Sequence, residues 1–204
     1  MDKRIGAQFY TVREYTQTIE DFEETCAKVS KIGYQTVQIS ATPLGAREMR
    51  EVLDRYGLEA VTTHRSFDDF QKNLEEIMDY NRTLGCKLCG VGMMPGWARE
   101  SGEGLSRFIV DTYWLQVGGM EPVSFIRNLG ERAMAVHFKD VRVNPDNSTE
   151  MAEVGEGNLD WDGIIRSCEG AGVKWALVEQ DVCRRNPFES LKLSYDYLRG
   201  RGFC

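Results

Sequence analysis

The sequence predicts an α/β protein in which helices cover a parallel β-sheet. Short apolar runs alternate with amphipathic stretches along the 204 residues, as expected of repeated βα units. The apolar runs are nearly continuous, which is typical of strands buried on both faces. The predicted helices of the first half end at glycines that the next strand follows directly, and glycine supplies the left-handed cap of such αβ loops. A barrel and a doubly wound sheet both fit this pattern.

Four strands are predicted in the first half of the chain, at 5–12, 36–40, 58–64 and 86–94. Three helices lie between them, because apolar side chains recur there at three- and four-residue spacing. The three sets are Phe22, Cys26, Val29 and Ile32; then Met49, Val52, Leu53 and Tyr56; then Phe70, Leu74, Ile77, Tyr80 and Leu84. The helices end at Gly33, Gly57 and Gly85, which marks their C-termini.

The second half repeats the theme with three strands, at 108–115, 133–138 and 174–179. Helices are predicted at 121–129 and 161–171, ending at Gly130 and Gly172, and a closing helix at 190–199. No G-x-G-x-x-G opens a helix after the first strand, which disfavours a dinucleotide-binding sheet.

One interval is too short for the repeat. Residues 96–110 must hold a loop, any helix and the return strand before Asp111. A βαβ crossover needs at least about 10–12 residues including its helix, so this interval is close to the minimum. The chain shows seven strands where a barrel needs about eight. We therefore expect one domain spanning residues 1–204 that lacks one βα unit near 96–110.

Composition excludes several classes of protein. The net charge of −7 and pI near 5.0 argue against a nucleic-acid partner, which would require clustered Lys and Arg. No apolar run reaches the ~20 residues that span a bilayer, and the first residues carry no signal-peptide pattern, so we expect a cytoplasmic protein. Cys86 and Cys89 form a CxxC, but no second CxxC or nearby His completes a zinc site, and we interpret both as buried thiols.

Three polar side chains stand at the ends of predicted strands. Asp111, His137 and Glu179 each follow an apolar run, on three successive βα units. In a parallel α/β fold these strand ends meet at the face that carries the active site. Two carboxylates and an imidazole suit a divalent ion, namely Mn²⁺, Mg²⁺, Co²⁺ or Zn²⁺.

Each of these residues also has an ordinary interpretation. An Asp after a strand is often a helix cap or turn former, and a lone His in a strand is more often a core residue than a ligand. Glu179 is harder to explain without a partner, because burying a carboxylate after Ala176, Leu177 and Val178 costs several kcal/mol.

Several motifs give the chain a resemblance to a known family. They are Asp111-Thr-Tyr-Trp114, Gly118-Gly119-Met-Glu-Pro122, Val136-His137-Phe-Lys139-Asp140, the opening Ile5–Val12, Thr63-His64, Gly155-Glu-Gly157 and Leu177–Asp181. In this order they closely resemble the sugar phosphate isomerase/epimerase family, which has the xylose isomerase-like (β/α)8 barrel and includes ketose 3-epimerases and inosose dehydratases. The resemblance implies an incomplete barrel of about seven strands and a small sugar or sugar phosphate as substrate.

The resemblance also implies a ligand set for the metal. Family members hold it with four side chains, and Asp111, His137 and Glu179 match the last three. The first ligand, a Glu on the fifth strand, has no counterpart here, so the gap at 96–110 coincides with the missing unit. In the related epimerases two glutamates act on opposite faces of the substrate; Glu179 matches one of these bases and the other is the missing ligand. Three protein ligands and an open position can still hold a metal ion.

Weaker candidates surround this site. By resemblance His64 hydrogen-bonds substrate, although a buried core His is the alternative. Trp114 can stack on a sugar face or pack at the rim, and Lys139 can pair with a hydroxyl, with a phosphate oxygen or merely with Asp140. We interpret Glu156 as a turn residue.

The sequence therefore predicts a metal-dependent isomerase or epimerase that moves a proton next to a sugar carbonyl, with Glu179 as base. Three alternatives stay open: a catalytically impaired barrel that binds sugar or metal, an inosose dehydratase-like lyase, and an endonuclease-like phosphodiesterase. The last should need a basic face and more than the two histidines present. A missing strand leaves two sheet edges, which proteins usually cover, so we also predict a homodimer across the gap.

Overall fold

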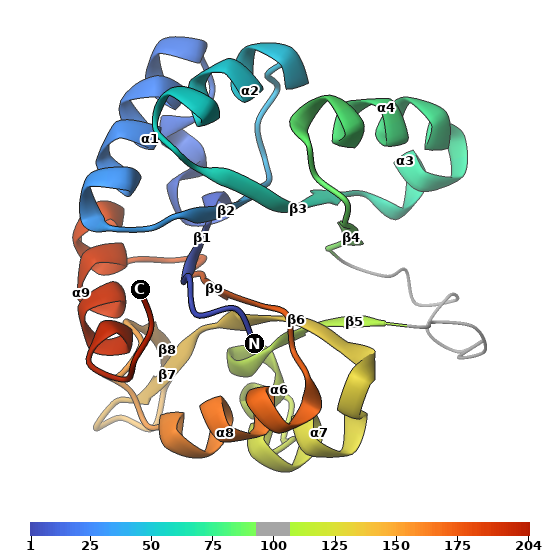
Figure 1. Ribbon diagram of the computed structural model, residues 1–204. Helices are drawn as coiled ribbons and strands as arrows, with labels where there is room; N and C mark the ends of the chain where they lie inside the picture. The colour runs from blue at the N-terminus through green and yellow to red at the C-terminus, as the bar shows by residue number, and fades with distance from the viewer. Residues whose placement is uncertain (93–106) are drawn as a thin grey trace.

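Seven parallel strands form a nearly closed barrel in the computed structural model, which describes residues 1–92 and 107–204 (Figure 1). The strands of this sheet, in chain order, are β1 (Gly6–Gln8), β2 (Thr36–Ile39), β3 (Glu59–Arg65), β4 (Cys89–Val91), β5 (Phe108–Asp111), β6 (Ala133–Phe138) and β9 (Trp175–Val178). Their order in the sheet is β4-β3-β2-β1-β9-β6-β5. The predicted incomplete barrel of about seven strands is confirmed.

The order of the strands in the sheet shows where the barrel is not closed. From β1 the sheet grows through β2 and β3 to β4 in one direction, and through β9 and β6 to β5 in the other. Within the described ranges, β4 and β5 are therefore the two end strands. The predicted missing unit lies between them, and most of the interval 96–110 falls outside the described residues.

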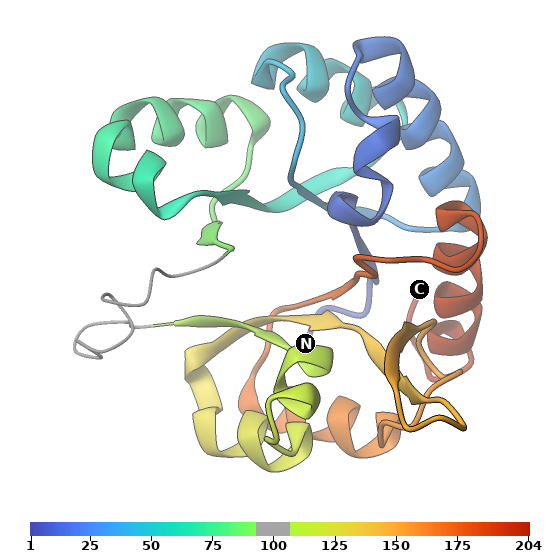
Figure 2. The ribbon, with the colours of Figure 1, turned by 180° about the vertical axis from the view of Figure 1, so that it is seen from behind.

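Helices lie around the outside of the barrel, as the view from behind also shows (Figure 2). They are α1 (Ile19–Ile32), α2 (Ala46–Arg55), α3 (Phe67–Lys72), α4 (Leu74–Leu84), α6 (Thr112–Val117), α7 (Pro122–Leu129), α8 (Trp161–Ala171) and α9 (Pro187–Arg199). Two 3₁₀ helices accompany them, η1 (Phe9–Tyr15) and η2 (Gly130–Arg132). Side chains such as Phe22, Met49, Ile164 and Leu191 are fully buried between helices and sheet. Much of the hydrophobic core is thus a layer between strands and helices.

Glycine ends three of the predicted helices as expected. Gly33, Gly85 and Gly172 follow α1, α4 and α8 with φ of 124°, 73° and 73°. At Gly33 a Cβ would also lie 2.4 Å from the hydroxyl of Tyr195. A side chain at this turn would therefore be strained by its backbone and blocked by its neighbour.

Two predicted strands are wrong in their second halves. The strand at 5–12 ends at Gln8, whose side chain accepts from the N–H of Tyr10 and begins η1. The strand at 108–115 ends at Asp111, whose carboxylate accepts from the N–H of Trp114 and caps α6. In both cases a polar side chain supplies the cap that lets an apolar run continue as helix.

Other boundaries also differ from the prediction. The strand predicted at 86–94 is only Cys89–Val91, and its last two positions lie outside the described residues. The predicted helix around Phe70–Leu84 is divided at Asn73 into α3 and α4. An antiparallel hairpin of β7 (Asp140–Val143) and β8 (Thr149–Ala152) was not predicted at all.

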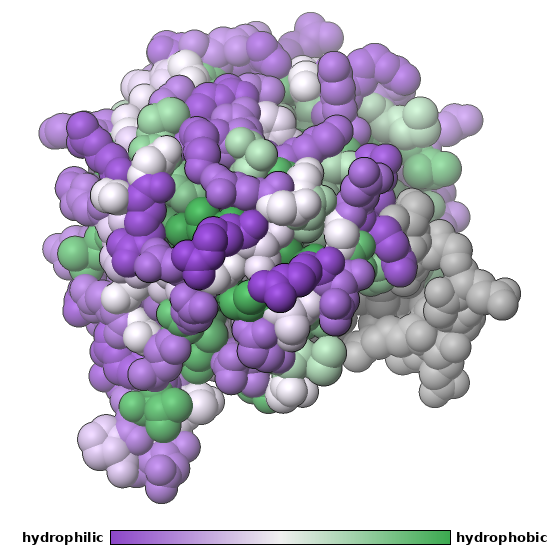
Figure 3. Space-filling model, turned by 60° about the horizontal axis from the view of Figure 1, so that its bottom comes forward, coloured by the Kyte–Doolittle hydropathy of each residue, from purple (hydrophilic) through white to green (hydrophobic). Residues whose placement is uncertain are grey.

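Most of the surface seen in Figure 3 is hydrophilic, with separate hydrophobic patches. Among the described residues, no helix is both long and apolar enough to cross a membrane. The predicted homodimer across the gap stays a prediction.

Candidate metal centre

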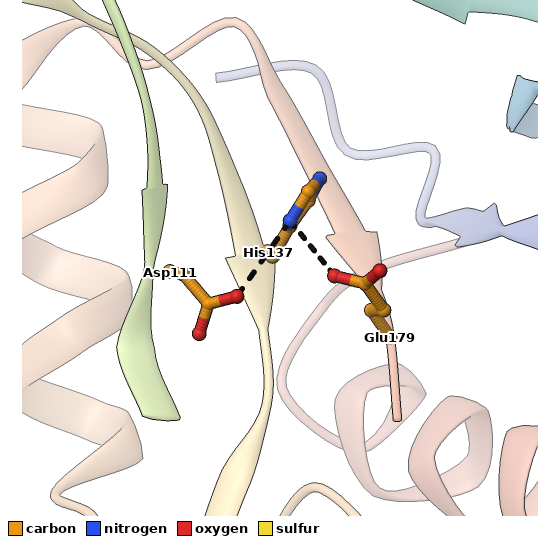
Figure 4. Close-up of side chains that lie close together, drawn as sticks. All are labelled: Asp111, His137 and Glu179. Carbon is orange, nitrogen blue, oxygen red and sulfur yellow. Dashed lines mark ion pairs between the residues drawn. The ribbon is translucent and has the colours of Figure 1, made fainter. Parts of the chain in front are cut away.

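The three predicted ligands meet at the C-terminal ends of three neighbouring strands (Figure 4). Asp111 is the last residue of β5, His137 lies in β6, and Glu179 directly follows β9. Asp111 pairs with His137 in the β5–β6 register, and β9 lies on the other side of β6. His137 Nδ1 lies 2.8 Å from Glu179 Oε2 and 3.8 Å from Asp111 Oδ2. One ligand atom from each residue lies within 4.8 Å of the other two, which is close enough for a common ion.

Each of these side chains is held through its other polar atom. The three hydrogen bonds run from Trp114 N to Asp111 Oδ1 (3.0 Å), from His137 Nε2 to Gln38 Oε1 (2.7 Å) and from Gln8 Nε2 to Glu179 Oε1 (2.8 Å). Because Gln38 Oε1 can only accept, His137 Nε2 carries a proton and Nδ1 is the atom that faces the carboxylates. Such outer partners orient metal ligands in known sites.

Opposite charges dominate the electrostatics of the pair Glu179 and His137. Burial alone would raise the pKa of Glu179, but the positive charges of His137 and Lys139 close to its carboxylate lower it to about 2. Burial would likewise lower the pKa of His137, but Glu179 and Asp111 raise it to about 9. Glu179 is therefore a carboxylate at neutral pH, the form that binds a cation.

Lys139 lies inside this cluster. It directly follows β6, its side chain is buried, and its Nζ lies 2.9 Å from Glu179 Oε2, 3.0 Å from Asp111 Oδ2 and 2.8 Å from Asp181 Oδ1. Burial opposes the charged form, but the neighbouring carboxylates raise the pKa of Lys139 above its usual range. The suggested pairing with Asp140 is wrong, because the ammonium binds three other carboxylates.

Asp140 instead fixes the loop that follows the hairpin. Its buried carboxylate accepts from the N–H groups of residues 155, 157 and 159 and from Trp161 Nε1 at 2.6–3.2 Å. A Cβ at Gly157 would lie 2.2 Å from Asp140 Oδ1, so only glycine permits this close approach. The Gly155-Glu156-Gly157 motif is thus structural, and Glu156 forms surface ion pairs with Arg142 and Arg185.

His64 reaches the cluster from β3. Its ring lies 5.4 Å from that of His137, centroid to centroid, in an edge-to-face arrangement. Burial, followed by the charge of His137, lowers the pKa of His64 to about 4. A neutral imidazole here can donate or accept a hydrogen bond, as a substrate hydroxyl requires. Its predicted role in substrate binding stays a prediction.

Trp114 lies in α6 rather than at a strand end. Its backbone N–H binds Asp111, its ring packs edge-to-face on Tyr113 at 5.1 Å, and 55% of the residue is exposed. The exposed ring leaves a role in stacking on a sugar as a prediction.

The donor set fits a divalent ion. Glu179 Oε2 is buried and receives no well-directed hydrogen bond, although Lys139 Nζ and His137 Nδ1 lie at ion-pair distance from it. An acceptor in this position has lone pairs left for a cation. Two carboxylate oxygens and one imidazole nitrogen form a ligand set that zinc and manganese sites use.

Three residues of the site were missed from the sequence. Gln8 and Gln38 hold Glu179 and His137, and Asp181 binds Lys139. A signal for the glutamines was present, because each has an apolar residue on both sides in the sequence. The same rule did identify His137.

Among the described residues, neither cysteine of the CxxC belongs to a group of three potential metal ligands. Cys86 Sγ donates to Leu88 O, Cys89 Sγ lies 3.0 Å from Thr63 Oγ1, and both cysteines are free. Burial raises the pKa of Cys86 to about 11, as expected of an unreactive thiol.

Solved structures share the whole architecture. A sugar phosphate isomerase/epimerase from Parabacteroides distasonis superposes with a TM-score of 0.74 at 17% identity, covering 97% of this chain and 93% of that chain. The chain has the xylose isomerase-like barrel fold. D-allulose 3-epimerase from Methylomonas sp. matches with a TM-score of 0.71 at 14% identity, covering 97% of both chains.

The same barrel fold carries other activities as well. The probable 3-DHS dehydratase AsbF from Bacillus anthracis matches with a TM-score of 0.71 at 15% identity, covering 98% of this chain and 100% of that chain. An AP endonuclease structure is also similar. No protein-family model matches the sequence, and no curated protein matches it. At these identities the comparisons establish the fold, and the activity must be argued from the site.

Proposed function

We propose that this xylose isomerase-like barrel is a metal-dependent isomerase or epimerase of a small sugar or sugar phosphate, with proton transfer next to the carbonyl as its reaction. The observation that carries the proposal is the convergence of Asp111, His137 and Glu179 to within 4.8 Å at the ends of three adjacent strands. Similar folds include the Methylomonas epimerase, which has been solved in complex with D-allulose.

Asp111 Oδ2, His137 Nδ1 and Glu179 Oε2 would hold the ion, which can be Mn²⁺, Mg²⁺, Co²⁺ or Zn²⁺. When bound, such an ion polarises a carbonyl and makes the neighbouring C–H more acidic. This assistance matters here, because a carboxylate with a pKa of about 2 is a weak base on its own.

Glu179 takes the proton in this proposal. Gln8 fixes its carboxylate through Oε1, and the side chain is largely buried. His64 contributes a neutral imidazole for a substrate hydroxyl. A single base returning the proton to the neighbouring carbon gives isomerisation, whereas epimerisation needs a second base on the opposite face. The glutamate expected there by resemblance has no counterpart in the sequence, which favours isomerisation.

The test compares wild-type protein with Glu179→Gln, and with Glu48→Gln as an exposed matched control. Each chelator-treated protein is titrated with Mn²⁺ by calorimetry, and each loaded protein is incubated with ketoses and aldoses in D₂O. We expect wild-type and Glu48→Gln to bind the ion and incorporate deuterium next to the carbonyl, and Glu179→Gln to lose at least about 100-fold in exchange rate.

Each alternative gives a different result in this experiment. Metal binding with no exchange on any sugar would support a non-catalytic barrel, and loss of water from the substrate would support a dehydratase. If wild-type protein bound no divalent ion, the proposal would be wrong.

A further inference from the structure

Lys139 contacts two of the three atoms that would hold a divalent ion. Its Nζ lies 3.0 Å from Asp111 Oδ2 and 2.9 Å from Glu179 Oε2. These are the two carboxylate oxygens that, with His137 Nδ1, form the proposed ligand set. One ammonium thus already bridges both carboxylates.

The backbone of Lys139 is fixed by contacts that do not involve its side chain. Thr112 Oγ1 accepts from Lys139 N at 3.0 Å and donates to Lys139 O at 2.7 Å. The ammonium is attached through four methylene groups, so Nζ can change position without moving this anchor. A buried ammonium still needs a carboxylate partner wherever it goes.

Asp181 provides such a partner away from the ligand oxygens. Its Oδ1 lies 2.8 Å from Lys139 Nζ, and its side chain is 21% exposed, against 18% for Asp111 and 5% for Glu179. Asp181 is also fixed, because its N–H contacts Met151 Sδ and its carbonyl accepts from Arg13. Lys139 therefore has two carboxylates in the proposed ligand set and a third outside it.

We propose that Lys139 competes with the divalent ion for Asp111 and Glu179, and that Asp181 holds its ammonium when the ion is bound. This inference rests on the proposed metal site. The physical reason is that two cations cannot share the same pair of oxygens at close range, so binding of the ion includes the displacement of Lys139. The lysine lowers the affinity for metal and stabilises the carboxylates of the metal-free protein.

Calorimetric titration with Mn²⁺ tests the competition directly. Chelator-treated wild-type, Lys139→Met, Asp181→Asn and the double variant are compared, with Lys87→Met as an exposed control. We expect Lys139→Met to bind Mn²⁺ at least tenfold more tightly while its metal-free form melts at a lower temperature. Asp181→Asn should bind several-fold more weakly, because the ammonium loses its alternative partner.

The double variant separates Asp181 as a partner of Lys139 from Asp181 as a metal ligand. If Asp181 acts only through the lysine, adding Asp181→Asn to Lys139→Met should leave the affinity unchanged. A further loss in the double variant would contradict this role. Lys139→Arg, which retains the charge, should not gain affinity.

Failure of the inference and failure of the metal site give different results. Wild-type binding with no tightening in Lys139→Met overturns the inference alone, whereas no binding by any variant overturns both. Circular dichroism of each metal-free variant checks its folding. If Lys139→Met does not fold, Lys139→Gln removes the same charge and decides the question by the same titration.

Discussion

Gln38→Leu tests whether the outer hydrogen bond of His137 matters for the metal site. Gln38 lies in β2, is fully buried, and accepts from His137 Nε2 at 2.7 Å. Leucine keeps most of the volume but removes the acceptor, so the imidazole loses the contact that fixes its orientation and leaves Nδ1 facing the ion.

The expected magnitude follows from two separate effects. Removing an outer partner of a metal-bound histidine typically costs about 10–100-fold in metal affinity, or roughly 1.4–2.7 kcal/mol. In the metal-free protein the unpaired Nε2–H of His137 costs about 1–3 kcal/mol. That cost is partly offset, because Gln38 Nε2 is itself buried without a hydrogen-bond partner and leucine removes it. We expect a net loss of stability of about 1 kcal/mol.

Calorimetry with Mn²⁺ measures the affinity, and urea unfolding of the chelator-treated protein measures the stability. Gln116→Leu, at an exposed position of α6, is the matched control and should change neither quantity. If Gln38→Leu bound Mn²⁺ within twofold of wild-type protein while remaining folded, the assignment of Nδ1 as a ligand atom oriented by Gln38 would be refuted.

Three further predictions concern stability and thiol chemistry. Asp140→Ala leaves four N–H donors of the 155–161 region without their acceptor, so the free energy of unfolding in urea should fall by at least about 4 kcal/mol. The control Asp146→Ala, at an exposed turn, should cost under about 1 kcal/mol. Equal losses in the two variants would contradict the role of Asp140 in fixing this loop. The exposed thiol of Cys204 should react with a disulfide reagent at pH 8 at least about 100-fold faster than the thiol of Cys86, because burial raises the pKa of Cys86 to about 11. Similar rates for the two thiols in folded protein would show that Cys86 is accessible to solvent. The pKa of Glu179 is lowered from 4.5 to about 2, so its ionised form stabilises the fold above about pH 4.5 by up to ~3 kcal/mol, and this stability is lost as the pH falls toward 2. In Glu179→Gln the free energy of unfolding should therefore depend less on pH between 4.5 and 2. An unchanged pH dependence would mean that the carboxylate is not ion-paired.

Local sequence was sufficient for the repeating architecture. Apolar runs and glycine-terminated helices predicted all seven strands of the sheet, because burial on both faces leaves a continuous hydrophobic signal. The sequence pattern failed where a capping side chain ends a strand and begins a helix, as Gln8 does for η1 and Asp111 for α6. The β7–β8 hairpin was missed because Arg142 and Glu150, paired across it, are charged and partly exposed and give no apolar run.

The sequence by itself determined that Asp111, His137 and Glu179 end consecutive units of a parallel fold, which is enough to place them on one face. Only the tertiary structure decided which atoms of these residues face one another, since Gln38 and Gln8 reach His137 and Glu179 from distant parts of the chain. The partners of Lys139 were decided in the same way, because Asp181 lies 42 positions along the chain. Hydrogen bonds and ion pairs depend on distances of about 3 Å, and the periodicity of a sequence specifies the face of an element but not such distances.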